Sequence, residues 1–170
     1  MIEYIVLVIV ILLILAYNYN PSSRHRGLPI EGKVVYADTK ANRRMFLSYQ
    51  YRIKSKPDFI VRLKSGDYAV LEYKSRAHGI YQGDIEQLIA CSIAVKESFK
   101  KKRVVLGIVY NSSGETKEIN LDVPVDDLAR KINRSLSTAR LIHGRKSIRH
   151  RPEKRKCYSC GNRNNCQYRV

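Results

Sequence analysis

Two runs of residues, PDFIVRL at 57–63 and YAVLEYK at 68–74, decide the fold of this chain. Both are rich in β-branched and aromatic residues, which favour strands. Between them, Ser-Gly-Asp at 65–67 is typical of a tight turn. The two runs therefore predict a β-hairpin.

The register of this hairpin follows from its turn. If residues 64–66 form a three-residue loop with Gly66 in the left-handed conformation, Phe59 pairs with Leu71. The large apolar pairs then share one face, whereas a slip of one residue would mix apolar and charged side chains. The same register predicts that Asp58 lies opposite Glu72.

The residues around the hairpin indicate an α/β domain. Apolar positions recur at helical spacing from Asp84, a candidate N-cap, to about residue 99, and a weaker helix is expected over 126–141. Strands are expected at 33–37, 45–53 and 103–110. This order predicts a mixed sheet flanked by helices, with the folded core at 33–142.

The N-terminal segment is strongly apolar. Residues 4–17 (YIVLVIVILLILAY) carry no charge, and a helix over 1–20 is close to the thickness of a bilayer core. It predicts a single transmembrane anchor, joined to the core by a linker at 21–32; the alternative is a buried core segment. Arg24, His25 and Arg26 follow it, so we expect a single-pass protein of the cell membrane with its core in the cytoplasm.

The charge of the chain indicates an anionic partner. The formal net charge is +17 and the isoelectric point is about 9.9, which is typical of proteins that bind nucleic acid or anionic membranes. From Lys131 to the C-terminus, 12 Lys and Arg residues stand against one acid, Glu153. A basic tail is expected at 143–170, and the alternative is a merely solvated charged segment.

The hairpin also predicts a catalytic site. Asp58 and Glu72 face to face, with Lys74 two residues along the same strand face, would suit Mg²⁺ or Mn²⁺ and the hydrolysis of phosphodiester bonds. The alternative is an ordinary cross-strand charge arrangement on a solvated face.

These residues resemble the PD-(D/E)xK nucleases in their RecB-like form, and more narrowly the CRISPR-associated exonuclease family called Cas-four. The resemblance implies a restriction-endonuclease-like fold and DNA as partner, with recombination or CRISPR adaptation proteins as further candidate partners. It implies that Asp58, Glu72 and the Tyr73 carbonyl bind the metal, and that Lys74 and Gln87 are catalytic. Gln87 has an alternative as a capping-box residue.

The ending of the chain extends the resemblance. Cys157, Cys160 and Cys166 reproduce the family's C-x2-C-x5-to-8-C motif, which implies an iron-sulfur cluster, with zinc or no metal as alternatives. The family's usual upstream cysteine is missing, and Cys91 stands where its helix motif has tyrosine. Candidates for a fourth ligand are Cys91, His25, His143 and His150, and His25 is also a candidate for the family's upstream active-site histidine.

Two other functions compete with a nuclease. A noncatalytic, membrane-anchored nucleic-acid-binding protein could retain the nuclease fold as a scaffold. A peripheral protein that binds anionic lipid would need no site at all, and would leave Asp58 and Glu72 without a role.

Overall fold

The computed structural model describes residues 27–40, 42, 44–144, 153–158, 160, 163–166 and 169–170. The chain divides into two compact units, Met1–Ile132 and Asn133–Val170. The first contains the sheet and the hairpin, and the second contains the basic, cysteine-bearing end of the chain.

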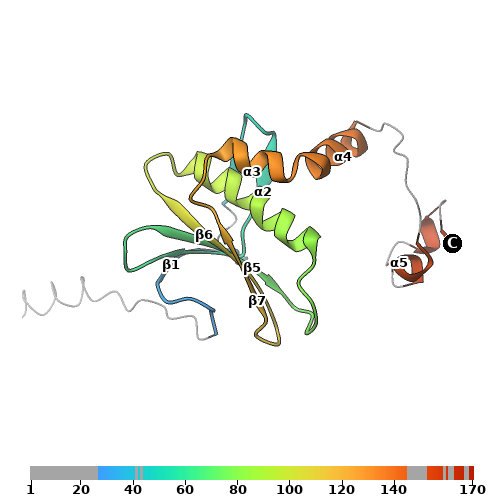
Figure 1. Ribbon diagram of the computed structural model, residues 1–170, viewed down its shortest axis with the longest axis horizontal. Helices are drawn as coiled ribbons and strands as arrows, with labels where there is room; N and C mark the ends of the chain where they lie inside the picture. The colour runs from blue at the N-terminus through green and yellow to red at the C-terminus, as the bar shows by residue number, and fades with distance from the viewer. Residues whose placement is uncertain are drawn as a thin grey trace, which may run out of the picture. The chain divides into compact units, whose positions relative to one another are not determined.

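The first unit is built on a five-stranded sheet in the order β1-β4-β5-β6-β7, with helix α2 (Gln82–Ser98) across one face (Figure 1). Strands β5 and β6 are parallel and α2 connects them, whereas the other neighbours in this sheet are antiparallel. The strands are β1 (Lys33–Ala37), β4 (Phe59–Arg62), β5 (Tyr68–Lys74), β6 (Val104–Asn111) and β7 (Thr116–Asn120).

The predicted register of the central hairpin is confirmed. Phe59 pairs with Leu71 and Val61 with Ala69 along β4 and β5. Gly66 has a φ of +92°, which a residue with a Cβ rarely adopts, so the turn depends on this glycine. The strand at 33–37 is confirmed as β1.

Both faces of the central strands β5 and β6 are buried, which explains why these strands are apolar without alternation. On one face, a Cβ added at Gly107 would lie 2.9 Å from Leu88 Cδ2, so this glycine lets α2 approach the sheet closely. On the other face, Val61, Leu71 and Ile108 belong to a core cluster. Leu28 and Ile30, from the segment expected to be a linker, pack against that cluster.

Two expected elements are each divided in the structure. The single strand expected over 45–53 is wrong: β2 (Phe46–Ser48) and β3 (Ile53–Ser55) form a separate hairpin that packs against α2. Its turn places Arg52 at a φ of +52°. The single helix expected over 126–141 is also wrong, because α3 (Val125–Lys131) ends at the buried Ile132 and α4 (Asn133–His143) follows.

Strand β7 was not expected from the sequence, and its exposed edge position accounts for this. Four of its five residues are exposed and the other is half-buried, so it has little apolar pattern. The second unit contains α4, the short helix α5 (Lys154–Tyr158) and a 3-10 turn at Arg163–Asn165.

The expected fold class needs one correction. A mixed sheet with helices is compatible with the structure, but the transmembrane helix that formed part of this prediction is not supported. Among the described residues, no helix combines the length and the apolar character needed to cross a bilayer. The expected span at residues 1–20 lies outside the described residues.

Candidate active site

The hairpin brings Asp58 and Glu72 to the same edge of the sheet. Because β4 and β5 are antiparallel, the start of β4 lies beside the end of β5. Asp58 directly precedes β4, and its Oδ2 accepts a hydrogen bond of 2.7 Å from the backbone N–H of Tyr73. The half-buried Asp58 carboxylate is thus hydrogen-bonded to the backbone of the residue that follows Glu72.

Glu72 is a buried acid with one unsatisfied oxygen. The residue is 3% exposed, and its Oε1 accepts hydrogen bonds from Lys74 Nζ (3.0 Å) and from Gln87 Nε2. Its Oε2 is buried without a hydrogen-bond partner among the described residues. Burial raises the pKa of Glu72, the charge of Asp58 raises it further, and Lys74 opposes both effects. A cation beside Oε2 would relieve this burial cost.

Lys74 lies between acceptors from the strand and from the helix. Its Nζ is 3.0 Å from Glu72 Oε1 and 2.8 Å from Gln87 Oε1, and it forms a longer ion pair of 3.7 Å with Asp84 Oδ1. The Lys74 side chain is only 15% exposed. A ladder of charges on a solvated sheet face is therefore wrong for Glu72 and Lys74, because α2 covers this part of the sheet.

Gln87 projects from α2 onto the pair formed by Glu72 and Lys74. Its amide nitrogen donates to Glu72 and its amide oxygen accepts from Lys74, so a single side chain orients both. The capping-box alternative for Gln87 is wrong. Asp84 fills the capping role at the start of α2. Its carboxylate accepts a hydrogen bond of 2.8 Å from the backbone N–H of the N-cap residue, Tyr81.

Asp84 and Arg76 belong to the same polar cluster, and sequence reasoning missed this role. Asp84 is 8% exposed, forms an ion pair with Arg76 Nη2 and lies near Lys74 Nζ. Arg76 also donates to the carbonyl of Gly79 (3.0 Å) and lies over the ring of Tyr81. The signal available in the sequence was the spacing of Glu72, Lys74 and Arg76, which are charged residues two positions apart.

The donor set suits a hard divalent cation that keeps part of its water shell. Among the described residues, no group of three or more His, Cys, Asp or Glu side chains gathers as for a complete metal cage. Two carboxylates are nevertheless enough for Mg²⁺, which commonly takes one or two from the protein and fills its octahedron with water and phosphate oxygens. The unsatisfied Oε2 of Glu72 is the oxygen best placed to receive such an ion.

The three cysteines of the second unit are free thiols. Turns connect them: Cys160 N–H donates to Cys157 O (3.3 Å) and Cys166 N–H donates to Arg163 O (3.3 Å). Within the described part of the chain, these three cysteines do not gather into a metal site.

The candidates for a fourth cluster ligand differ in what the structure says of them. Cys91 is buried in the core of the first unit, and burial raises its pKa to about 12, so it stays protonated. His143 is exposed at the end of α4. His25 and His150 lie outside the described residues.

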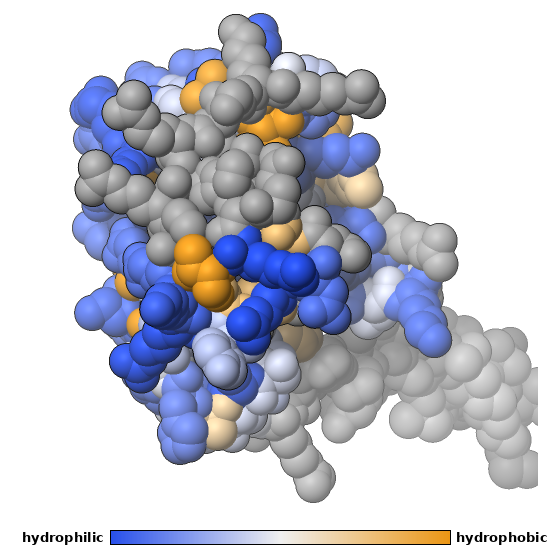
Figure 2. Space-filling model, turned by 90° about the vertical axis from the view of Figure 1, so that its right-hand side faces the viewer, coloured by the Kyte–Doolittle hydropathy of each residue, from blue (hydrophilic) through white to orange (hydrophobic). Residues whose placement is uncertain are grey.

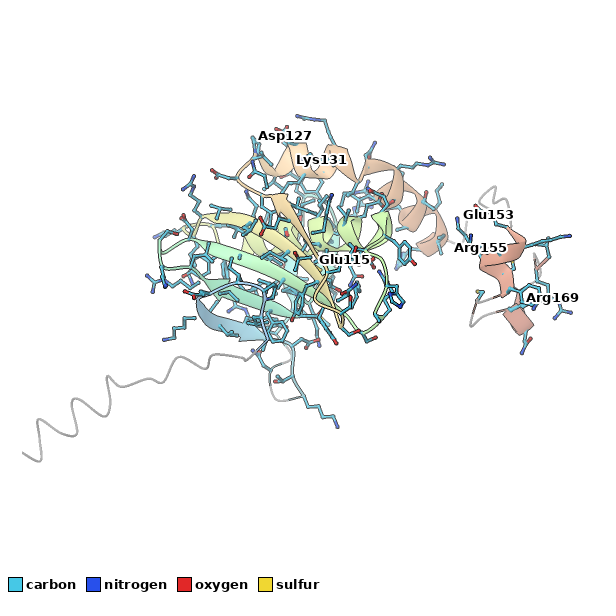
Figure 3. The ribbon with its side chains drawn as sticks, turned by 60° about the horizontal axis from the view of Figure 1, so that its bottom comes forward. Glu115, Asp127, Lys131, Glu153, Arg155 and Arg169 are labelled. Atoms are coloured by element: carbon cyan, nitrogen blue, oxygen red, sulfur yellow. The ribbon has the colours of Figure 1, made fainter. Side chains whose placement is uncertain are left out.

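Three basic residues precede the first tail cysteine on α5. Lys154, Arg155 and Lys156 are exposed on α5, immediately before Cys157. Lys156 forms an ion pair of 2.9 Å with Glu153, and Figure 3 labels Glu153 and Arg155. Exposed cations on one short helix are suited to phosphate contacts that do not depend on base sequence.

Comparison with known proteins adds little to this geometry. No family model matches the sequence, and no curated protein matches it. Five chains of solved structures do match. Among them is the crystal structure of SSO0001, at 18% identity and a TM-score of 0.39, covering 69% of this chain and 52% of that one. The chain thus spans about half the length of that protein.

Proposed function

We propose that this chain is a metal-dependent deoxyribonuclease of the PD-(D/E)xK type, which hydrolyses phosphodiester bonds with Mg²⁺ or Mn²⁺. Asp58 and Glu72 hold the ion, and Lys74 is the catalytic cation. The observation that carries the proposal is the buried, unsatisfied Oε2 of Glu72, at the sheet edge where Asp58 and Lys74 also lie. A buried acceptor with no partner is costly unless a ligand supplies one.

Each residue has a separate task in this proposal. A bound divalent ion supplies polarisation of the phosphate and activation of the attacking water. Lys74 carries three donors, two of them directed at Glu72 and Gln87, and its positive charge stabilises the negative charge that develops on the phosphate. Gln87 keeps Lys74 and Glu72 in position from the rigid helix α2.

The charge of the chain supports a nucleic acid as substrate. The net charge of +17 favours association with a polyanion through phosphate contacts that release counterions. Hydrophilic side chains make up most of the described surface that Figure 2 shows, and apolar residues form only small separate patches there.

The test is a cleavage assay with the purified chain, labelled single-stranded or duplex DNA, and Mg²⁺, Mn²⁺ or EDTA. Asp58→Asn, Glu72→Gln and Lys74→Ala are each expected to lower the rate at least about 100-fold, as removal of a charge-stabilising group does in other enzymes. The matched controls are Lys64→Ala, an exposed lysine at the turn end of the hairpin, and Glu118→Gln, an exposed acid on β7.

Binding measured beside cleavage separates catalysis from binding alone. Fluorescence anisotropy should show that Glu72→Gln retains its affinity for DNA while cleavage is lost. If wild-type protein binds DNA but cleaves no substrate with either ion, the nuclease proposal is refuted and a noncatalytic binding protein takes its place.

A further inference from the structure

A pocket of about 370 Å³ lies at the same end of the sheet as Asp58 and Glu72, but on the face opposite α2. Tyr73 of β5 and Tyr110 of β6, which are paired in the parallel ladder, form part of its lining. Pro29, Ser112 and Thr116 also line it. Its volume lies at the lower end of the range for small-molecule sites, roughly 300 to 1,000 Å³.

The two tyrosine rings form an aromatic wall. Their centroids are 5.2 Å apart and their planes are inclined by 50°. Tyr110 is buried, whereas Tyr73 is 41% exposed although it lies in a central strand. An aromatic ring that is held against a second ring and remains open to solvent is a suitable platform for a flat aromatic ligand.

The pocket also offers hydroxyl groups for the edge of such a ligand. In the described part of the chain, the hydroxyls of Tyr73, Tyr110, Ser112 and Thr116 make no hydrogen bond to another residue. Each can both donate and accept. The side chain of Asn111, by contrast, already forms hydrogen bonds within the protein.

Asn111 and Glu115 hold the wall of the pocket in place. Asn111 Nδ2 donates to Glu115 Oε2 (2.9 Å), and its Oδ1 accepts from the backbone of Ser113 and of Glu115. Glu115, labelled in Figure 3, also accepts from the backbone N–H of Gly79 (3.1 Å). The loop after β5 and the β6–β7 turn are therefore joined, so the pocket is largely formed before a ligand arrives.

The pocket and the candidate active site share their backbone. The N–H of Tyr73 donates to Asp58 Oδ2 (2.7 Å), and the N–H of Ser112 donates to the carbonyl of Lys74 (3.1 Å). A phosphate bound to an ion between Asp58 and Glu72 would thus lie beside a strand end whose next side chain, Tyr73, projects to the other face. A nucleotide places its base one sugar away from its phosphate.

We propose that this pocket binds one unstacked nucleobase of a single-stranded DNA substrate, next to the phosphate that is cut, with Tyr73 as its stacking platform. The position relative to the cut rests on the proposed nuclease function, but the binding of a base does not. A base inside a duplex is stacked and cannot enter, so the pocket selects single strands and frayed ends.

The test measures base stacking without catalysis. A short single-stranded oligonucleotide containing 2-aminopurine is titrated with the purified 170-residue chain in EDTA, and both fluorescence quenching and affinity are recorded. Tyr73→Ala leaves the backbone unchanged and is expected to weaken binding about 10- to 100-fold, in line with the usual loss of a stacking residue. Tyr73→Phe should bind within about threefold of wild type, because the ring remains.

Tyr49→Ala is the matched control. Tyr49 is 83% exposed in the turn between β2 and β3 and does not line this pocket, so its loss should leave quenching and affinity unchanged. Wild-type affinity of Tyr73→Ala, or an equal loss in Tyr49→Ala, would overturn the proposal. Thermal melting of Tyr73→Ala shows whether the variant is folded. If it is not, a wild-type chain that does not quench 2-aminopurine, or a loss of affinity in Tyr73→Phe, still overturns the proposal.

Cleavage of a substrate that lacks one base separates this proposal from the nuclease itself. If DNA is cut and an abasic site beside the cut leaves the rate unchanged at every position, the base pocket is refuted and the nuclease stands. If no DNA is cut but quenching is lost in Tyr73→Ala alone, the base pocket stands and the nuclease is refuted.

Discussion

Mg²⁺ is expected to stabilise the fold through Glu72. A buried acceptor that lacks a partner costs about 1–3 kcal/mol, and Glu72 Oε2 is such an acceptor beside the charge of Asp58. An ion at 100 times its dissociation constant contributes about 2.7 kcal/mol to the free energy of unfolding. For a unit of this size each kcal/mol raises the melting temperature by roughly 4 °C, so the expected rise is about 10 °C.

The assay is thermal unfolding of the purified chain in EDTA and at increasing Mg²⁺ concentration. Mg²⁺ is chosen because thiolates have little affinity for it, so the tail cysteines do not contribute. Glu72→Gln keeps the shape of the side chain but removes its charge, and should reduce the rise to about 2 °C or less. Glu118→Gln, an exposed acid on β7, should retain the full rise. An equal rise in Glu72→Gln, or no rise in wild type, would refute this reasoning.

Three further changes test other parts of the structure. Gly32→Ala should lower the free energy of unfolding by about 1–3 kcal/mol in a denaturant titration, because its Cβ would lie 2.5 Å from a backbone oxygen of β4. Gly83→Ala, with no atom within 4 Å of its Cβ, should be neutral or stabilising by up to about 1 kcal/mol, and equal losses would contradict this packing. Gln87→Leu should lower the cleavage rate about 10- to 100-fold, and an unchanged rate would remove its positioning role. After treatment with chelator, a thiol reagent at pH 8 should modify the three tail cysteines and leave Cys91 until the protein unfolds, because burial raises the pKa of Cys91 to about 12. Reaction of all four thiols at one rate in the native protein would contradict its burial.

The central hairpin could be predicted from the sequence because its determinants are local. Gly66 sets the turn, and the short loop that it closes pairs Phe59 with Leu71. The proximity of Asp58 to the end of β5 follows from that register. Strand β5 and helix α2 were also recognisable, since their patterns are long and uninterrupted.

Other features could not be predicted, because they depend on contacts between distant segments. The strand expected over 45–53 divides at a turn in which Arg52 adopts a positive φ. No residue in that stretch is of a type that favours a positive φ there. The expectation of Asp84 as the N-cap of α2 is wrong, because Tyr81 is the N-cap and Asp84 lies in the first turn. Only the folded chain shows that the Asp84 carboxylate pairs with Arg76 and lies near Lys74. Such ion pairs depend on how the start of α2 packs beside the end of β5.

The sequence by itself determined which side chains stand at the edge of the hairpin, because strand pairing over a short loop has few alternatives. Only the tertiary structure decided that Glu72 is buried with one unsatisfied oxygen, that Gln87 reaches it from α2, and that Tyr73 lines a pocket on the opposite face. The physical reason is that the burial of a side chain depends on which segments pack over the sheet. Those segments lie far from the hairpin along the chain.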